Sequence, residues 1–123
     1  MMRLLLVLSL GALVGFVSGS RFAGGQEART RREPQFENEH LKVWKTFIYP
    51  NQPLAMHRHE NGRAIVAIRG GTLHVVTEAG DEKAMHWESG KAYWLDADPP
   101  GELHGDVNRG EDPMEVIVLE LQR

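Results

Sequence analysis

The stretch HRHENGRAIVAIRG, from His57 to Gly70, places two histidines one residue apart, ahead of a turn and a run of aliphatic residues. Residues two apart on an extended strand point to the same face, so His57 and His59 could present both imidazoles to one ion. Neutral imidazole binds zinc, copper, iron and nickel well. An H-x-H pair alone is weak evidence of a metal site, because further ligands must come from a distant strand.

Short segments with the composition of strands continue outward from this stretch. They are rich in Val, Ile, Tyr, Trp and Thr, and segments rich in Gly, Pro, Asn and Asp separate them. No window has the period of a long amphipathic helix, so the pattern predicts an all-β sandwich or barrel. The last segment is apolar on both faces, and we expect it to lie in the middle of a sheet and to be covered on both sides. The predicted strands are 41–49, 63–70, 72–78, 92–95 and 114–122.

A second histidine motif lies nearer the C-terminus. PPGELHGDVN, from Pro99 to Asn108, has the spacing P-x-G-x-x-H-x-x-x-N. Together with the first stretch it resembles the two conserved motifs of the cupin superfamily, and the resemblance covers nearly all of the chain after residue 38. It implies a small cupin-type jelly-roll β-barrel with the site inside the barrel. The matching residues are His57, His59 and Gly70 in the first motif, and Pro99, Gly101, His104 and Asn108 in the second.

The chain departs from the family's pattern at three places. Asn51 stands where the first motif begins with glycine, which costs little because asparagine tolerates turn conformations. Eight residues rather than five separate Gly90 from Pro99, which indicates a longer loop beside the site. Arg63 stands where the family has a metal-binding glutamate. A guanidinium stays protonated and has no acceptor, so the family's four-ligand site is incomplete.

Two interpretations of the site follow from the resemblance. In the one that we favour, His57, His59 and His104 bind one divalent transition metal, as in the thiol-dioxygenase branch of the cupins. Iron is the preferred ion, with zinc, nickel, copper and manganese as alternatives, and Arg63 points away or holds a small anionic substrate. In the other, no metal binds, and the barrel is a binding module for a small anionic ligand without catalysis. Whether the chain is an enzyme stays open. If it is one, we expect a metal-dependent reaction of the oxygenase type.

Three other side chains are weaker candidates for the site. Trp94 and Tyr93 follow Gly90 and could line a substrate pocket, although such aromatic residues more often belong to a core. Glu102 precedes His104 by two residues and would share its face if the strand begins early enough. We consider it as a replacement for the missing glutamate ligand.

The N-terminal segment has the outline of a secretory signal. Arg3 precedes the uncharged apolar run Leu4 to Val17, and small residues follow near a cleavage point. We expect a signal peptide at 1–19 and export to the periplasm or the extracellular space; an uncleaved membrane anchor is the alternative. Residues 20–38 are polar and glycine-bearing, as in a flexible tether, which leaves a cupin domain at 39–123.

Composition limits the partners. The net charge is −3, and removal of Arg3 with the signal changes it to −4, so nothing favours nucleic acid as a partner. Cysteine is absent, which excludes disulfides and thiolate ligands. We expect a small-molecule ligand and a homodimer, because barrels with exposed strand edges often pair. The apolar strand near Leu41 to Tyr49 is the expected contact.

Overall fold

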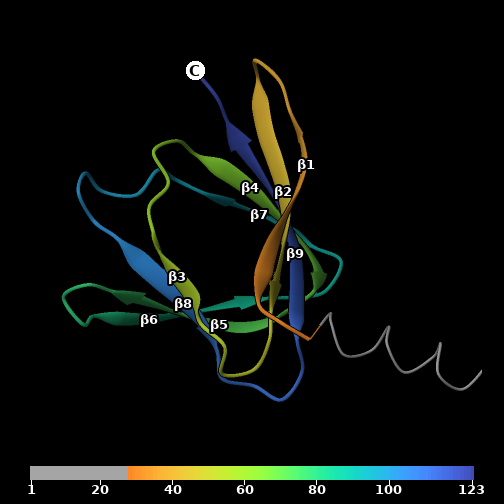
Figure 1. Ribbon diagram of the computed structural model, residues 1–123, viewed down its shortest axis with the longest axis vertical. Coiled ribbons are helices and arrows are strands. Elements are labelled where there is room, and N and C mark those ends of the chain that lie inside the picture. The colour runs from red at the N-terminus through yellow and green to blue at the C-terminus, as the bar shows by residue number, and fades with distance from the viewer. Residues whose placement is uncertain (1–27) are drawn as a thin grey trace, which may run out of the picture.

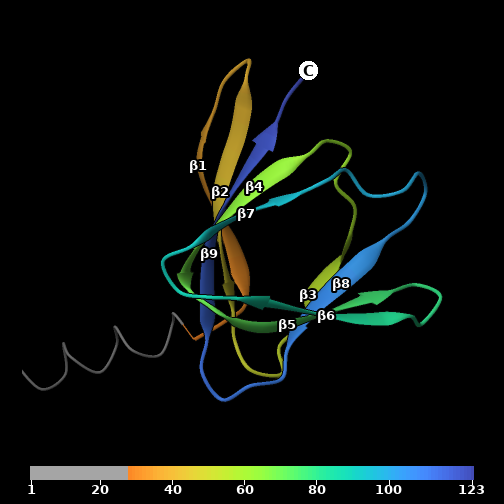
Figure 2. The same cartoon turned by 180° about the vertical axis from the view of Figure 1, so that it is seen from behind.

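The computed structural model describes residues 28–123, which form nine strands and no helix, and therefore no helix that could cross a membrane. The strands form two antiparallel sheets, ordered β1-β2-β9-β4-β7 and β3-β8-β5-β6 (Figures 1 and 2). The all-β prediction is confirmed. The strands are β1 (Arg31–Glu37), β2 (Leu41–Ile48), β3 (Leu54–His57), β4 (Arg63–Arg69), β5 (Gly71–Thr77), β6 (Glu82–Trp87), β7 (Ala92–Leu95), β8 (His104–Asn108) and β9 (Met114–Leu121).

The hydrophobic core is built from alternate residues of the strands. In β4 the buried positions are Arg63, Ile65 and Ala67, and the residues between them are more exposed. Because successive side chains of a strand point to opposite faces, one charged residue shares this inner face with the core. Truncation of a fully buried residue such as Met114 to alanine would cost about 2–5 kcal/mol. The core consists of Trp44, Ile48, Ile65, Ala67, Leu73, Trp87, Met114, Val116 and Val118.

Strand β9 lies in the middle of the larger sheet, between β2 and β4, as its apolar sequence predicted. Only one of its faces is fully buried, however. Val116 and Val118 point into the core, whereas Ile117 and Leu119 are half-buried and Leu121 is 38% exposed. The expectation that β9 is covered on both sides was therefore wrong.

Residues 31–37 form a strand, although they were predicted to belong to a flexible tether at 20–38. They form β1, which pairs with β2, and the guanidinium of Arg32 lies 4.9 Å from the centre of the Trp44 ring. The side chain of Asn38 accepts hydrogen bonds from two backbone N–H groups of the connecting turn. The strand is therefore specified by backbone pairing rather than by apolar residues, and the boundary predicted at residue 39 falls inside a hairpin. The signal segment and residues 20–27 lie outside the described residues.

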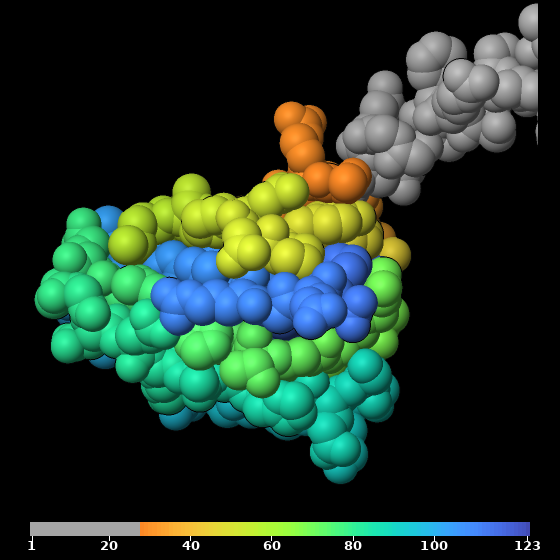
Figure 3. Space-filling model, turned by 90° about the horizontal axis from the view of Figure 1, so that it is seen from below, coloured from red at the N-terminus to blue at the C-terminus, as the bar shows by residue number. Residues whose placement is uncertain are grey.

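The same hairpin removes the edge that was expected to form a dimer contact. Strand β2 has β1 on one side and β9 on the other, so the segment 41–49 has no free backbone edge. Seen from below, a blue segment from the C-terminal part of the chain lies between a yellow segment and a green segment from its middle (Figure 3).

The motif residues other than the histidines hold turns and close contacts. Asn51 has φ 58°, the left-handed conformation that asparagine tolerates, so its replacement of glycine is accommodated as predicted. A Cβ on Gly70 would lie 2.0 Å from the carbonyl oxygen of Trp87, so only glycine fits there. The side-chain amide of Asn108 donates to the carbonyl oxygens of Ile48 (2.9 Å) and Asp112 (2.8 Å) and so joins the end of β2 to the loop before β9.

Candidate metal centre

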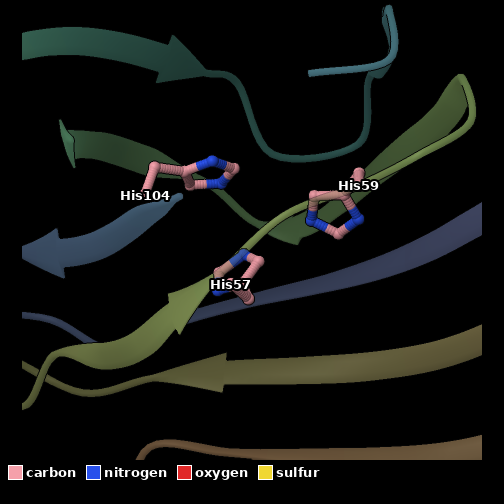
Figure 4. Close-up of side chains that lie close together, drawn as sticks. All are labelled: His57, His59 and His104. Carbon is pink, nitrogen blue, oxygen red and sulfur yellow. The ribbon is translucent and has the colours of Figure 1, made fainter. Parts of the chain in front are cut away.

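The three predicted ligands come together. His57 ends β3, His104 begins β8, and the two are paired across the smaller sheet. His59 follows in the loop after β3. One ring nitrogen from each histidine lies within 4.8 Å of those of the other two, and Figure 4 shows the rings gathered around a common space. His59 and His104 are buried and His57 is half-buried, so the group is inside the protein.

His59 reaches this position by a different route from the one predicted. The two side chains would share one face only on a strand that runs through both histidines, but β3 ends at His57. Asp98 holds the next residues instead: its carboxylate accepts from the backbone N–H of His59 (2.7 Å), and its own N–H donates to the carbonyl oxygen of His59 (2.9 Å). The guanidinium of Arg58 also donates to the carbonyl oxygen of Asp98. The lengthened loop thus fixes one of the candidate ligands.

Hydrogen bonds at Nδ1 leave Nε2 of two histidines free to bind an ion. Nδ1 of His57 lies 2.6 Å from the carbonyl oxygen of Ala55, and Nδ1 of His59 lies 2.5 Å from Oε1 of Glu120. A carbonyl and an ionised carboxylate only accept hydrogen bonds, so both Nδ1 atoms carry the proton. Such contacts orient metal-binding histidines and fix their tautomer.

The protein environment also keeps these histidines neutral. Burial lowers the pKa of His57, and the contact with Ala55 opposes this shift only in part. Burial and the nearby charge of Arg63 lower the pKa of His59 to about 2. Metal binding requires the neutral imidazole, so the donor set suits a transition metal at neutral pH.

Arg63 points into the barrel. It is 6% exposed, its Nη1 donates to the carbonyl oxygen of Asp96 (3.0 Å), and its Nη2 lies 3.8 Å from Oδ1 of Asp98. Glu120 is its neighbour across the β4–β9 pair. The turn at Asn61-Gly62 therefore leaves Arg63 on the inner face of β4, the direction that the resemblance predicts for this position.

Three acidic residues around the histidines were not predicted from the sequence. Asp98 is within the lengthened loop, Glu120 is on the inner face of β9, and Asp106 follows His104 by two residues. Oδ2 of Asp106 lies 3.7 Å from Nε2 of His57, and Oδ1 lies 3.8 Å from Nε2 of His104. Burial raises the pKa of Asp106, and the two histidines oppose this. The period of a strand that begins at His104 would have indicated Asp106.

Two cavities adjoin the histidines. A small one, of about 40 Å³, lies inside the barrel and is lined in part by His59, Arg63 and Asp106. A larger and open one, of about 600 Å³, is lined in part by Arg63, Trp94 and His104. The loop residues Asp96, Asp98, Pro99 and Glu102 form part of the wall of this second cavity.

The weaker candidates differ in their relation to these cavities. Trp94 is 54% exposed, and its Nε1 donates to the Asp96 carboxylate at the wall of the larger cavity. Tyr93 lines neither cavity; its ring packs near Trp87, and its hydroxyl accepts from the backbone N–H of Glu88. Glu102 precedes the start of β8 and is exposed, so it does not share the face of His104.

Comparisons with known proteins support the fold but not a narrower family. No protein-family model and no curated protein sequence matches the chain. A crystal structure of a cupin domain from Bordetella pertussis Tohama I is similar with a TM-score of 0.67 and 21% identity, covering 81% of this chain and 100% of that one. An RmlC-like cupin family protein with a double-stranded β-helix fold from Methanocaldococcus jannaschii has a TM-score of 0.61 and 13% identity, with 80% and 84% covered.

A third similar structure is an uncharacterised conserved protein with a double-stranded β-helix domain from Klebsiella pneumoniae, at a TM-score of 0.57 and 22% identity, with 78% and 79% covered. At these identities the likeness concerns the fold alone. The arrangement of strands and the two motifs agree with it. The chain therefore has the fold of the cupin superfamily, with a group of three histidines that could hold a metal ion.

Proposed function

We propose that this chain binds one divalent transition metal through His57, His59 and His104 and acts as a metalloenzyme of the oxygenase type on a small molecule. The observation that carries the proposal is the convergence of three ring nitrogens within 4.8 Å in a buried group. Iron(II) is the favoured ion, because three protein ligands leave coordination positions open. Bound there, the ion would supply a Lewis acid and open sites for substrate.

The other residues of the site would then have positioning roles. Glu120 and the carbonyl of Ala55 hold the rings of His59 and His57, and Asp98 fixes the loop at His59. The substrate would occupy the larger cavity, beside His104 and the exposed ring of Trp94. Its volume of about 600 Å³ is within the ordinary range for small-molecule sites.

Elemental analysis of protein purified from its native compartment tests the proposal. We expect about one equivalent of a transition metal per chain, lost in His104→Ala. Protein that contains no metal, and that binds none when titrated with Fe²⁺, Zn²⁺ or Mn²⁺, would contradict it.

The second candidate is a metal-free binding module for a small anion. In its favour, Arg63 and Trp94 line the larger cavity. Against it, the guanidinium of Arg63 already faces Asp98 and the carbonyl of Asp96, so an anion would compete with these groups. Calorimetry with small carboxylates, in the presence and absence of chelator, separates the two: binding that chelator leaves unchanged favours the module.

We further propose that the protein is exported and forms a homodimer. The apolar segment after Arg3 supports export, and fractionation of cells that express the full chain tests it.

A free sheet edge at β1 and the half-exposed apolar outer face of the larger sheet support association into a homodimer. A monomeric mass in solution at micromolar concentration would contradict the dimer.

A further inference from the structure

Asp106 lies on the interior face of β8, beside the histidine group. It is the third residue of the strand and has the same parity as His104, so both side chains point into the barrel. It is 8% exposed, which is unusual for a carboxylate. Across the sheet it is paired with Leu54 of β3 and Val75 of β5, both apolar.

The Asp106 carboxylate is aimed at the candidate ligand atoms. Its two oxygens lie 3.7 Å from Nε2 of His57 and 3.8 Å from Nε2 of His104. These are the ion pairs of Asp106, and within residues 28–123 no donor lies within hydrogen-bond distance of its carboxylate. Two ligands that are each about 2.1 Å from one ion can be at most about 4.2 Å apart. Both separations are within that limit.

The small interior cavity connects Asp106 with the third histidine. Asp106 and His59 line the same space of about 40 Å³, which also contacts Arg63. A buried carboxylate without a hydrogen-bond donor is costly, and a divalent cation between Asp106 and the histidines would offset that cost. Arg63 stands at the position of the family's glutamate but is positively charged and cannot bind the cation. Its guanidinium contacts Asp98 and the carbonyl oxygen of Asp96.

We propose that Asp106 is the fourth ligand of the metal centre and supplies the carboxylate that Arg63 cannot. The inference rests on the proposed function, in which the three histidines bind a metal. It makes the donor set three imidazole nitrogens and one carboxylate oxygen, with the oxygen from β8 rather than from β4. One negative charge then faces the ion from a strand that already carries His104.

Titration of the metal-depleted chain with Co²⁺ tests the assignment. The variants are Asp106→Ala, Asp106→Asn and His104→Ala, with Glu111→Ala as the matched control, because Glu111 is a carboxylate that follows the same strand but is exposed and lines neither cavity. We expect Kd to rise about ten-fold or more in both Asp106 variants, and the visible Co²⁺ spectrum to change. Glu111→Ala should retain both the wild-type affinity and the wild-type spectrum.

The outcomes separate the two proposals. If wild-type protein binds Co²⁺ and His104→Ala does not, but both Asp106 variants keep the wild-type affinity and spectrum, Asp106 is no ligand while the three-histidine site stands. If wild-type protein binds no metal, both proposals fail. Asp106→Asn preserves size and is used if the alanine variant does not fold. If neither folds, infrared difference spectra of the wild type decide: the absence of a carboxylate band shift on Co²⁺ binding overturns the assignment.

Discussion

Oε1 of Glu120 lies 2.5 Å from Nδ1 of His59, while the backbone of Glu120 is paired with that of Arg63. One acidic residue of β9 therefore connects a candidate ligand with the arginine that stands in the glutamate position. Burial raises the pKa of Glu120, and the charge of Arg63 lowers it. This carboxylate holds the tautomer of His59 and offsets part of the positive charge beside it.

Removal of this contact should weaken metal binding. In Glu120→Ala the imidazole of His59 loses its acceptor, and we expect a Kd for Zn²⁺ about 10–100-fold higher, as is common when the partner of a histidine ligand is lost. Glu115→Ala is the control, because Glu115 is on the same strand but faces Lys45 on the outer side. Calorimetry measures both, and equal affinities in the two variants would contradict the positioning role of Glu120.

Metal should raise the stability of the protein. A ligand that binds only the native state adds RT ln(1 + [L]/Kd), about 2.7 kcal/mol at a free concentration of 100 Kd. For a domain of this size we expect Tm to fall by about ten degrees or more when chelator removes the ion. His104→Ala should abolish the difference, and His74→Ala, a histidine that contacts Glu82 instead, should preserve it. A wild-type Tm that does not respond to chelator would favour the metal-free interpretation.

The sequence was sufficient for the fold and for the three histidines, because both depend on local patterns. Alternation, turn residues and the two ordered motifs indicate a β-barrel of this kind, and the resemblance that the motifs carry implies the three candidate ligands. Strands without an apolar period were missed. β1 has the sequence RREPQFE, and its charged residues are compatible with an edge strand only because β2 supplies the backbone partners.

The carboxylates of the site could not be assigned from the sequence, for reasons of register. Glu120 becomes relevant only when β9 is known to lie beside β4 with Glu120 opposite Arg63. Asp98 acts through contacts with the backbone of His59 across a loop, and such contacts leave no periodic pattern in the sequence. Asp106 was accessible in principle, since it is two residues from His104, but the segment 104–108 is short and polar, and it was not predicted as a strand.

Stability of the metal-free protein should fall as the pH is lowered from about 7.5 to 5.5. Burial lowers the pKa values of His57 and His59 in the folded chain, whereas the unfolded chain has ordinary values near 6.5. Below that pH the unfolded state binds protons that the folded state does not, so each histidine removes up to about 1.4 kcal/mol per pH unit. Asp106 and Glu120, whose pKa values are raised, act in the opposite direction, so they reduce the slope that the histidines produce. Urea unfolding at three pH values measures the slope, and a constant or rising free energy of unfolding would contradict it.

The substitution Arg63→Glu tests what the inward arginine does to the metal. Its guanidinium faces the barrel interior, so its charge repels a divalent ion, while Asp98 and Glu120 offset that charge only in part. We expect Arg63→Gln, which removes the charge, to lower the Kd for divalent metal about ten-fold, and Arg63→Glu, which also restores the family's ligand, to lower it further. Affinity for any small anion should fall in both variants. Calorimetry at about pH 7.5, where histidine is mostly neutral, measures all three proteins. An unchanged metal affinity in both variants would show that the neighbouring carboxylates already cancel the charge of Arg63 at the ion, and would remove Arg63 from the metal centre.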